Sequence, residues 1–243
     1  MNTISPAEYY YLSNLVAGSG IEMLKLTLKD LCLRGVLKIE SRSIIVDQRY
    51  LKYRNRLFFS RGIDFEKYST DSHAQNFFLT LFEKKEELQF YAIRRYVKKE
   101  LAKSDFDNLI NKDLRQKGLC YFRVFPSSSA RKMRKSISTQ VEELDLQFDL
   151  LLEKYPEEFA QKIEKLGSHI LFLSEENLKK LQNHSDLLKK IGFAELSASF
   201  NSDLFVSIGL FSSFDLSGGF GDVGGFDGFG GGDFGGGGAM GDW

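Results

Sequence analysis

The spacing of hydrophobic residues in the first 46 positions predicts two helices followed by a β-hairpin. Ser5-Pro6-Ala7-Glu8 carries helix-start signals: a serine N-cap, proline at the first helical position and an acid in the first turn. A second run at helical spacing ends at Arg34-Gly35, a cation followed by a glycine C-cap. Two short apolar runs, residues 36–39 and 44–46, then flank Ser41-Arg42-Ser43, which predicts a hairpin with Arg42 in its turn. This order of elements is typical of a winged helix.

The same order of elements recurs in the next segment. Helical patterns cover residues 73–82 and 88–101, and Ser104-Asp105 can cap a third helix. The apolar residues 119–125 then predict a strand. A second winged-helix-like module follows from this order, the alternative being a plain helical bundle.

A short repeat supports the two-module interpretation. Lys29-Asp30-Leu31 and Lys112-Asp113-Leu114 are each followed, after two residues, by a cation, a glycine and an aliphatic residue. In both places a helix would stop at glycine and lead directly into a strand, because glycine adopts the left-handed conformation at no steric cost. The likeness is short, so chance is the competing explanation.

Beyond Pro126 the pattern is helical and then low in complexity. Hydrophobic spacing predicts helices over residues 141–155 and 157–166, whereas residues 167–173 fit either a strand or a continued helix. Residues 218–243 hold 14 glycines among 26 positions, which predicts disorder because glycine loses the most entropy on folding. Regularly spaced phenylalanines and the terminal Trp243 suit weak multivalent contacts, the alternative being an inert solubilising tail.

These patterns predict a mainly α protein with small β-hairpins (α+β). We expect a first winged-helix-like module (residues 1–66), a second one (67–126), a helical segment (127–200) and a disordered Gly/Phe/Asp tail (201–243).

The net charge of zero hides a strong asymmetry along the chain. Residues 1–135 hold 26 Lys+Arg and 15 Asp+Glu, whereas residues 136–243 hold 7 and 18. The basic excess of the first part predicts a surface for an anionic partner. The alternative is that the two parts neutralise each other, within one chain or by self-association between chains.

Candidate catalytic chemistry is absent from the sequence pattern. The histidines His73, His169 and His184 lack metal-ligand spacing, and Cys32 and Cys120 lie among apolar residues as core positions do. We therefore expect no enzyme activity and no cofactor. Two cysteines without a disulfide framework, and no signal-peptide or membrane-spanning pattern, indicate a cytoplasmic protein, with peripheral attachment to a membrane as an option.

Two basic patches are the candidate binding residues. Lys and Arg contacts to phosphates suit a nucleic acid or an anionic membrane surface equally well. Against sequence-specific DNA binding, the helix before the first hairpin offers mainly Lys25, Lys29 and Arg34, without the usual base-reading set. The candidates are Arg42, Arg49, Lys52, Arg54, Arg56 and Arg61 in the first patch, and Arg131, Lys132, Arg134 and Lys135 in the second.

Residues 28–39 resemble a motif of a widespread, uncharacterised group of bacterial predicted membrane proteins, in which a leucine-rich helix ends at Arg-Gly before a Leu-Lys-Ile strand. The glycine run 235–238 and Trp243 are similar to the glycine-rich, Trp-terminated end of that group. The resemblance implies the cytoplasmic part alone, since the membrane spans are missing here, and it implies no catalytic residue.

The sequence thus predicts a non-enzymatic interaction or adaptor protein that binds a protein partner or an anionic surface. The alternative is a winged-helix regulator that binds nucleic acid through Arg42 and residues 49–61.

Overall fold

A computed structural model of the chain describes residues 4–15, 19–47, 52–100, 106–122, 125–182 and 184. The side chains of residues 44–47, 52–55, 98 and 182 are not described, and the predicted tail, residues 201–243, lies outside the described residues. The described residues form helices with small antiparallel sheets, which confirms the expected mainly α, α+β class.

The helices are α1 (Pro6–Ser13), α2 (Gly20–Leu33), α3 (His73–Lys84), α4 (Phe90–Glu100), α5 (Asp107–Gln116), α6 (Ser128–Leu146), α7 (Phe148–Lys154), α8 (Pro156–Leu166) and α9 (Glu175–Gln182), with 3₁₀ helices η1 (Phe65–Lys67) and η2 (Gly167–Phe172). The strands are β1 (Leu37–Asp47), β2 (Lys52–Arg61), β3 (Glu87–Gln89), β4 (Cys120–Phe122) and β5 (Phe125–Pro126).

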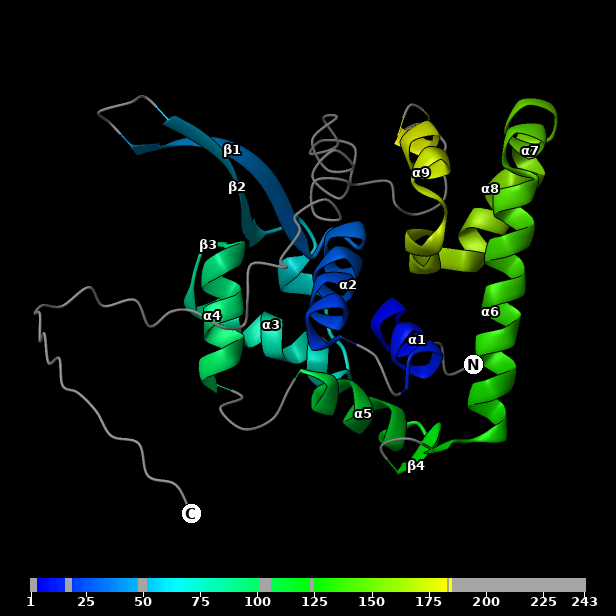
Figure 1. Cartoon of the computed structure of the whole chain (residues 1–243), viewed down its shortest axis with the longest axis horizontal. Helices are drawn as coiled ribbons and strands as arrows, with labels where there is room; N and C mark the ends of the chain where they lie inside the picture. Colours follow the sequence, from blue (N-terminus) through cyan, green and yellow to red (C-terminus); the bar gives the residue numbers. More distant parts are fainter. Residues whose placement is uncertain are drawn as a thin grey trace, which may run out of the picture.

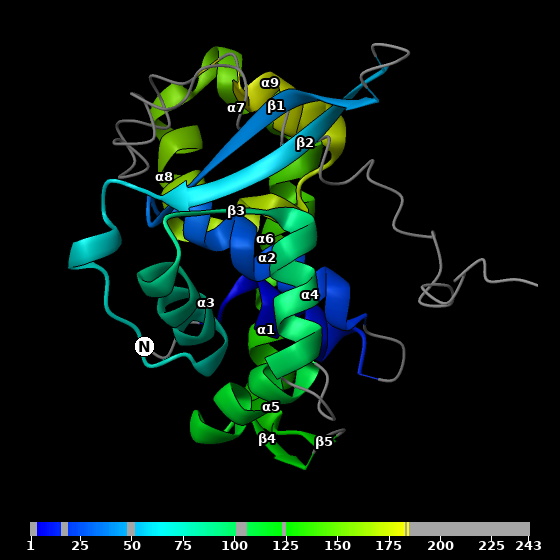
Figure 2. The ribbon, with the colours of Figure 1, turned by 90° about the vertical axis from the view of Figure 1, so that its left-hand side faces the viewer.

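The helices α1, α2, α3 and α5 pack together, with α2 between the ribbon β1–β2 and the rest of the body (Figures 1 and 2). Helix α1 contacts α2, α5 and α6, so it joins this body to the C-terminal helices. Helix α6 runs along the side of the molecule opposite α4 (Figure 1). The buried hydrophobic residues of these parts form a continuous cluster that includes Phe59, Phe78 and Phe148.

The first hairpin is longer than predicted, and its turn lies elsewhere. Arg42 is in the middle of β1, opposite Arg56 of β2, so the predicted turn at Ser41-Arg42-Ser43 is wrong. None of these three residues supplies the positive φ that tight hairpin turns favour, and polar side chains are compatible with a strand whose faces meet water. The polar stretch therefore continues the strand.

The sequence pattern also missed β3, a strand of three residues. It pairs antiparallel with β2, with Phe59 opposite Leu88, and makes the sheet order β1-β2-β3. This strand belongs to the second predicted module and pairs with the hairpin of the first. The module limits at residue 66/67 remain a prediction.

The predicted glycine stops are confirmed at both repeats. Gly35 and Gly118 each have φ of 69°, in the left-handed region. The N–H of Val36 donates to the Leu31 carbonyl at 2.9 Å, and that of Leu119 donates to the Leu114 carbonyl at 2.8 Å. Helices followed by a hairpin therefore occur twice, as α1–α2–β1–β2 and as α3–β3–α4–α5–β4–β5, and the division into two winged-helix-like modules stays a prediction.

A second repeat, which sequence reasoning missed, lies at the first turns of α1 and α3. Ser5 and Ser72 are the N-caps, and their hydroxyls accept from the N–H of Glu8 and Gln75, three residues on. An alanine precedes Glu8 and Gln75 in both helices. The signal was available in the sequence as Ser-x-Ala-Glu and Ser-x-Ala-Gln, a capping pattern.

The second hairpin and the C-terminal segment differ in detail from the prediction. Residues 119–125 form two short strands, not one, and β4 pairs with β5. Helix α6 begins at Ser128, so it contains the second basic patch that was expected to precede the helix. Residues 167–172 continue the chain as the 3₁₀ helix η2, which resolves the choice left open there in favour of helix.

Candidate functional site

Two residues of the first basic patch, Arg42 and Arg61, make contacts within the protein. The Arg42 guanidinium donates to the carboxylate of Glu40 at 2.5 and 2.9 Å and to that of Glu87 at 2.6 and 2.9 Å. It also lies 4.7 Å from the centre of the Phe58 ring. These contacts tie β1 to β3 across β2 and leave Arg42 largely neutralised.

Arg61 has a structural role as well. Its guanidinium donates to the Phe82 carbonyl at 2.8 Å and to the Glu83 carbonyl at 2.9 Å, in the last turn of α3. Those carbonyls lack partners within the helix, and a cation there also opposes the negative end of the helix dipole. Arg61 therefore stabilises the end of α3.

The rest of the first patch lies along the ribbon or beyond the described residues. Arg56 is half-buried and faces Arg42 in the strand register. Lys52 and Arg54 occupy positions of β2 whose side chains are not described, and Arg49 lies outside the described residues. Of this patch, the structure therefore describes only the side chains of Arg42, Arg56 and Arg61.

The second basic patch is better placed to meet a partner. Arg131, Lys132 and Lys135 are exposed on the first turns of α6. Arg134 points toward the body instead, where its guanidinium donates to the Leu12 carbonyl in α1 at 3.1 Å. Within the described chain, the three exposed cations form no ion pair with a carboxylate.

Exposed aromatic rings lie directly before this patch. Tyr121, Phe122 and Phe125 on β4–β5 retain 66%, 70% and 62% of their surface exposed to solvent. The rings of Phe122 and Phe125 meet edge to face, with centroids 6.3 Å apart. The apolar stretch had predicted a strand; of its described residues, Leu119 and Cys120 are buried and the three aromatic residues are exposed.

Local structure fixes the hairpin and the start of α6 together. The buried Ser127 follows β5 and is the N-cap of α6, its hydroxyl accepting from the Ala130 N–H at 3.2 Å. Its own N–H donates to the Leu119 carbonyl at 2.8 Å, at the start of the hairpin. The β4–β5 hairpin and the first turn of α6 are therefore held next to each other.

Helix α5 adds a third part to this surface. Lys112, Arg115 and Gln116 are exposed, and Asn108 is half-exposed one turn before Lys112. Helix α5 contacts β4, and α6 contacts β5. We call the combined surface the basic-aromatic face; its residues are Lys112, Arg115, Tyr121, Phe122, Phe125, Arg131, Lys132 and Lys135.

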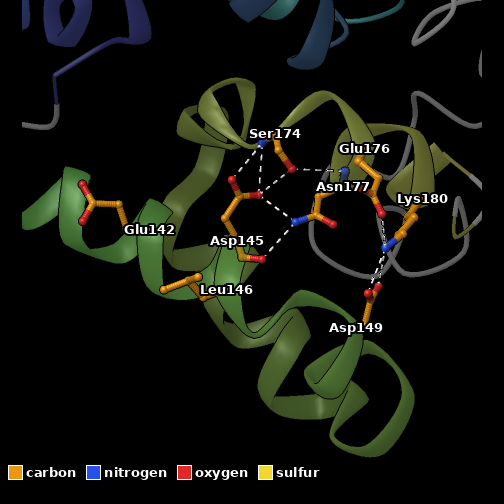
Figure 3. Close-up of a pocket in the computed structure, with 8 residues that line it drawn as sticks. All are labelled: Glu142, Asp145, Leu146, Asp149, Ser174, Glu176, Asn177 and Lys180. Carbon is orange, nitrogen blue, oxygen red and sulfur yellow. Dashed lines mark hydrogen bonds and ion pairs between the residues drawn. The ribbon is translucent and has the colours of Figure 1, made fainter.

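A depression lies between α6 and α9, and hydrogen bonds and ion pairs between helices line it (Figure 3). It has a volume of about 520 Å³, and acidic residues line much of it. The Asp145 carboxylate accepts from the Ser174 N–H at 3.0 Å and from Asn177 Nδ2 at 2.7 Å. It thereby satisfies N–H groups at the start of α9, as an N-terminal acid is expected to do. Lys180 and Asp149 pair across the same depression at 2.8 Å.

Buried charged groups lie where α1, α2, α3 and α5 meet. Glu8 is almost fully buried in α1, and Lys117 Nζ, beyond the end of α5, donates to its Oε2 at 2.8 Å. Burial raises the pKa of Glu8, although Lys117 and the Ser5 N–H act in the opposite direction. Asp113, also buried, accepts from the Ser72 hydroxyl and from the N–H groups of His73 and Ala74. The Glu8 carboxylate thus serves as an ion-pair partner, and the Asp113 carboxylate caps the start of α3.

The cysteines and His169 have structural surroundings. Cys32 and Cys120 are buried free thiols, as expected for core residues. Burial lowers the pKa of His169, whose ring packs against those of Tyr9 and Phe172. Among the described residues, no group of three or more His, Cys, Asp or Glu could hold a metal ion. Within the same residues, none of the helices is long and apolar enough to span a bilayer.

Comparison of the chain with protein-family models, with curated proteins and with solved structures gives no match. The resemblance of residues 28–39 to uncharacterised bacterial predicted membrane proteins therefore stays a prediction.

Proposed function

We propose that this protein is a non-enzymatic interaction or adaptor protein that attaches to an anionic surface through the basic-aromatic face. The observation that carries the proposal is the adjacency of three exposed aromatic rings on β4–β5 and three exposed cations on α6. Each exposed cation near an anionic membrane contributes about 1 kcal/mol to attachment. The proposal covers two kinds of partner. One is the cytoplasmic surface of a membrane, and the other is a protein.

A non-catalytic role is supported by what the described ionisable residues do. The carboxylates of Asp30, Asp113 and Asp145 accept from several donors each and hold helices together. Catalytic acids and bases instead need access to a substrate in a cleft. The central carboxylate of the depression at α6–α9, that of Asp145, already accepts from the Ser174 N–H, the Ser174 hydroxyl and Asn177 Nδ2.

The second candidate function is nucleic-acid binding, and helix α5 favours it. Asn108, Lys112, Arg115 and Gln116 follow one another at helical spacing on the helix that precedes the β4–β5 hairpin. These residue types contact base edges and phosphates in major-groove readers. In the first module, α2 buries most of its surface, so it is not available for such contacts. A nucleic-acid site would therefore be in the second module and not at Arg42.

Retention of the full-length protein on immobilised heparin, a sulfated polyanion, tests the proposed function. We expect retention that weakens steeply between about 50 and 200 mM salt, because the contacts are electrostatic. The triple change Arg131→Glu, Lys132→Glu and Lys135→Glu should lower the salt concentration needed for elution.

The matched control is Lys154→Glu, Lys165→Glu and Lys179→Glu, which changes the net charge equally at exposed positions on α7, α8 and α9. Equal loss of retention in both triple variants would show that overall charge, and not this face, is responsible. Duplex DNA tests the second candidate: changing Arg115 and Gln116 to Ala should weaken its binding, and absence of binding at low salt contradicts it.

A further inference from the structure

We propose that the basic-aromatic face binds lipid bilayers that carry anionic headgroups, with Phe122 and Phe125 inserted among the lipids. The cations of α5 and α6 then contact the headgroup phosphates. This inference rests on the proposed function, since it names the surface to which the same face attaches.

The phenylalanine rings are the first argument for an apolar environment. Phe122 and Phe125 lie at facing positions of β4 and β5, and each exposes more than half of its surface. The exposed Tyr121 adjoins them in sequence. Contiguous apolar surface in water is unfavourable, and on monomeric proteins such patches mark sites that a partner or a membrane covers.

The shape of this region favours a bilayer. In two perpendicular views, β4–β5 lies at the lower extremity of the molecule, next to the end of α5 and the beginning of α6 (Figures 1 and 2). A protruding tip can enter a fluid lipid interface directly, whereas a protein partner must offer a matching cavity. Aromatic rings concentrate at the headgroup level of membranes, and the Tyr121 hydroxyl can stay among the polar groups there.

The cations provide charge complementarity on both sides of the rings. Lys112 and Arg115 lie on α5, which precedes the hairpin, while Arg131, Lys132 and Lys135 lie on α6, which follows it. The nearest acids in sequence are Asp107 and Asp113, and the second of these is buried as a cap of α3. Anionic lipids attract such clusters of Lys and Arg.

A nucleic acid would contact the cations of this surface but not its phenylalanine rings. A duplex offers phosphates to the cations, but its bases are stacked inside, so Phe122 and Phe125 would remain in water. Single strands bind aromatic side chains by stacking on ring faces. Here the edge of one ring packs toward the face of the other. A lipid interface therefore accounts for the rings and the cations together.

Co-sedimentation of the full-length protein with vesicles tests the inference. We expect binding to vesicles of phosphatidylcholine that contain phosphatidylserine, and much weaker binding to pure phosphatidylcholine. Changing both Phe122 and Phe125 to Ser should reduce binding about tenfold, because membrane affinity scales with buried apolar area. The matched control changes Leu146 and Leu150, exposed apolar residues of α6 and α7, to Ser and should bind as the wild type does.

A fluorescence readout separates insertion from simple adsorption. In a chain with Trp243→Phe, the change Phe122→Trp places a single reporter in the hairpin. We expect a blue shift of its emission with phosphatidylserine vesicles and quenching by brominated lipids. Unchanged emission, or binding that survives the loss of both phenylalanines, would overturn the inference. Thermal unfolding of each variant checks that these exposed substitutions leave the fold intact.

The outcomes distinguish this inference from the function on which it rests. Retention on heparin without vesicle binding overturns the lipid assignment and leaves attachment to an anionic partner in place. Binding of duplex DNA in preference to vesicles overturns it in favour of nucleic acid. Loss of every polyanion interaction overturns both proposals.

Discussion

Gln75 in the first turn of α3 donates a hydrogen bond from Nε2 to Oδ2 of Asp30 in α2, at 2.8 Å. Both side chains are buried, and the bond joins two parts of the chain that lie 45 residues apart. Glu8, at the equivalent position of α1, meets Lys117 beyond the end of α5. The first turn of α3 is thus anchored on α2, and the first turn of α1 on the residue that follows α5.

Removing the Asp30 carboxylate should destabilise the fold. Asp30→Ala leaves the buried Gln75 amide and the Arg34 guanidinium, which donates to Asp30 at 2.8 Å, without this acceptor. We expect the free energy of unfolding to fall by about 2–3 kcal/mol, measured by urea denaturation. Asp71→Ala, at an exposed position, is the control and should stay within about 0.5 kcal/mol of the wild type. Equal stability of both variants would contradict a structural role for Asp30.

Three glycines beside the two hairpins, Gly35, Gly62 and Gly118, should differ in their sensitivity to alanine substitution. An added Cβ meets nothing within 4 Å at Gly118, whose cost to alanine, about 1 kcal/mol, comes from its positive φ alone. At Gly35, which has the same φ, the Cβ would also lie 2.9 Å from Asp64 Oδ2. At Gly62 it would lie 2.1 Å from the backbone oxygen of Gly35, which cannot move aside. Thermal unfolding should therefore show the loss of stability rising from Gly118→Ala to Gly35→Ala to Gly62→Ala.

Glu8 should make stability depend on pH in a specific direction. Burial raises its pKa above the ordinary value, so the folded state binds the proton more tightly than the unfolded state does. Its contribution is then greatest at low pH and is lost as pH rises through the folded pKa. Since glutamine cannot ionise, the stability of Glu8→Gln relative to the wild type should increase from about pH 4 to pH 7. Urea denaturation of both proteins across this range checks it, with Glu86→Gln, at an exposed position, as the comparison.

His169 should make the folded protein less stable as the pH falls, which is opposite to the effect of Glu8. Burial lowers the pKa of its imidazole, so the neutral form is favoured in the folded protein and stability falls as pH decreases through the usual histidine range. His169→Phe keeps the ring contacts with Tyr9 and Phe172 and should flatten the decline in melting temperature between about pH 7 and pH 5. The exposed His184→Phe serves as the comparison. The idea fails if both variants keep the wild-type slope.

The two basic patches should differ in their effect on polyanion binding. Arg42 is held between the carboxylates of Glu40 and Glu87, whereas Arg131 is exposed on α6. Arg42→Ala should therefore leave elution from heparin almost unchanged, while Arg131→Ala should lower the required salt concentration. The reverse order would assign the anion-binding surface to the first hairpin.

The helix stops were predictable because their signals are local. Gly35 and Gly118 follow a cation at the end of an apolar helical pattern, and the left-handed conformation that both adopt is one that glycine alone enters easily. The N-caps Ser5 and Ser72 carry equally local signals, one of which the sequence reasoning used and one of which it missed.

The sheet could not be predicted in the same way. The turn expected at Ser41-Arg42-Ser43 was wrong, and β3 was missed, because both depend on which distant strand supplies the partner. Glu87-Leu88-Gln89 becomes a strand through pairing with residues 58–60, and a three-residue run carries little periodicity of its own.

The candidate face was predictable only in part. The cluster of cations from Arg131 to Lys135 is visible in the sequence, although Arg134 turns out to face the body. The apolar pattern of residues 119–125 predicts a strand but gives no sign that Phe122 and Phe125 are exposed, since apolar residues are most often inside. Their exposure depends on how far the hairpin extends beyond the core, which only the packing of α5 and α6 determines.

The pairing of β2 with β3 also constrains synthesis of the chain on the ribosome. In a nascent chain that ends before residue 87, β3 has not yet been made, so one edge of β2 is unpaired. Glu8 also lacks its ion-pair partner until Lys117, 109 residues further on, has been added. Unpaired strand edges recruit other chains. The N-terminal portion is therefore most exposed to aggregation while the ribosome adds the segment from η1 to α5.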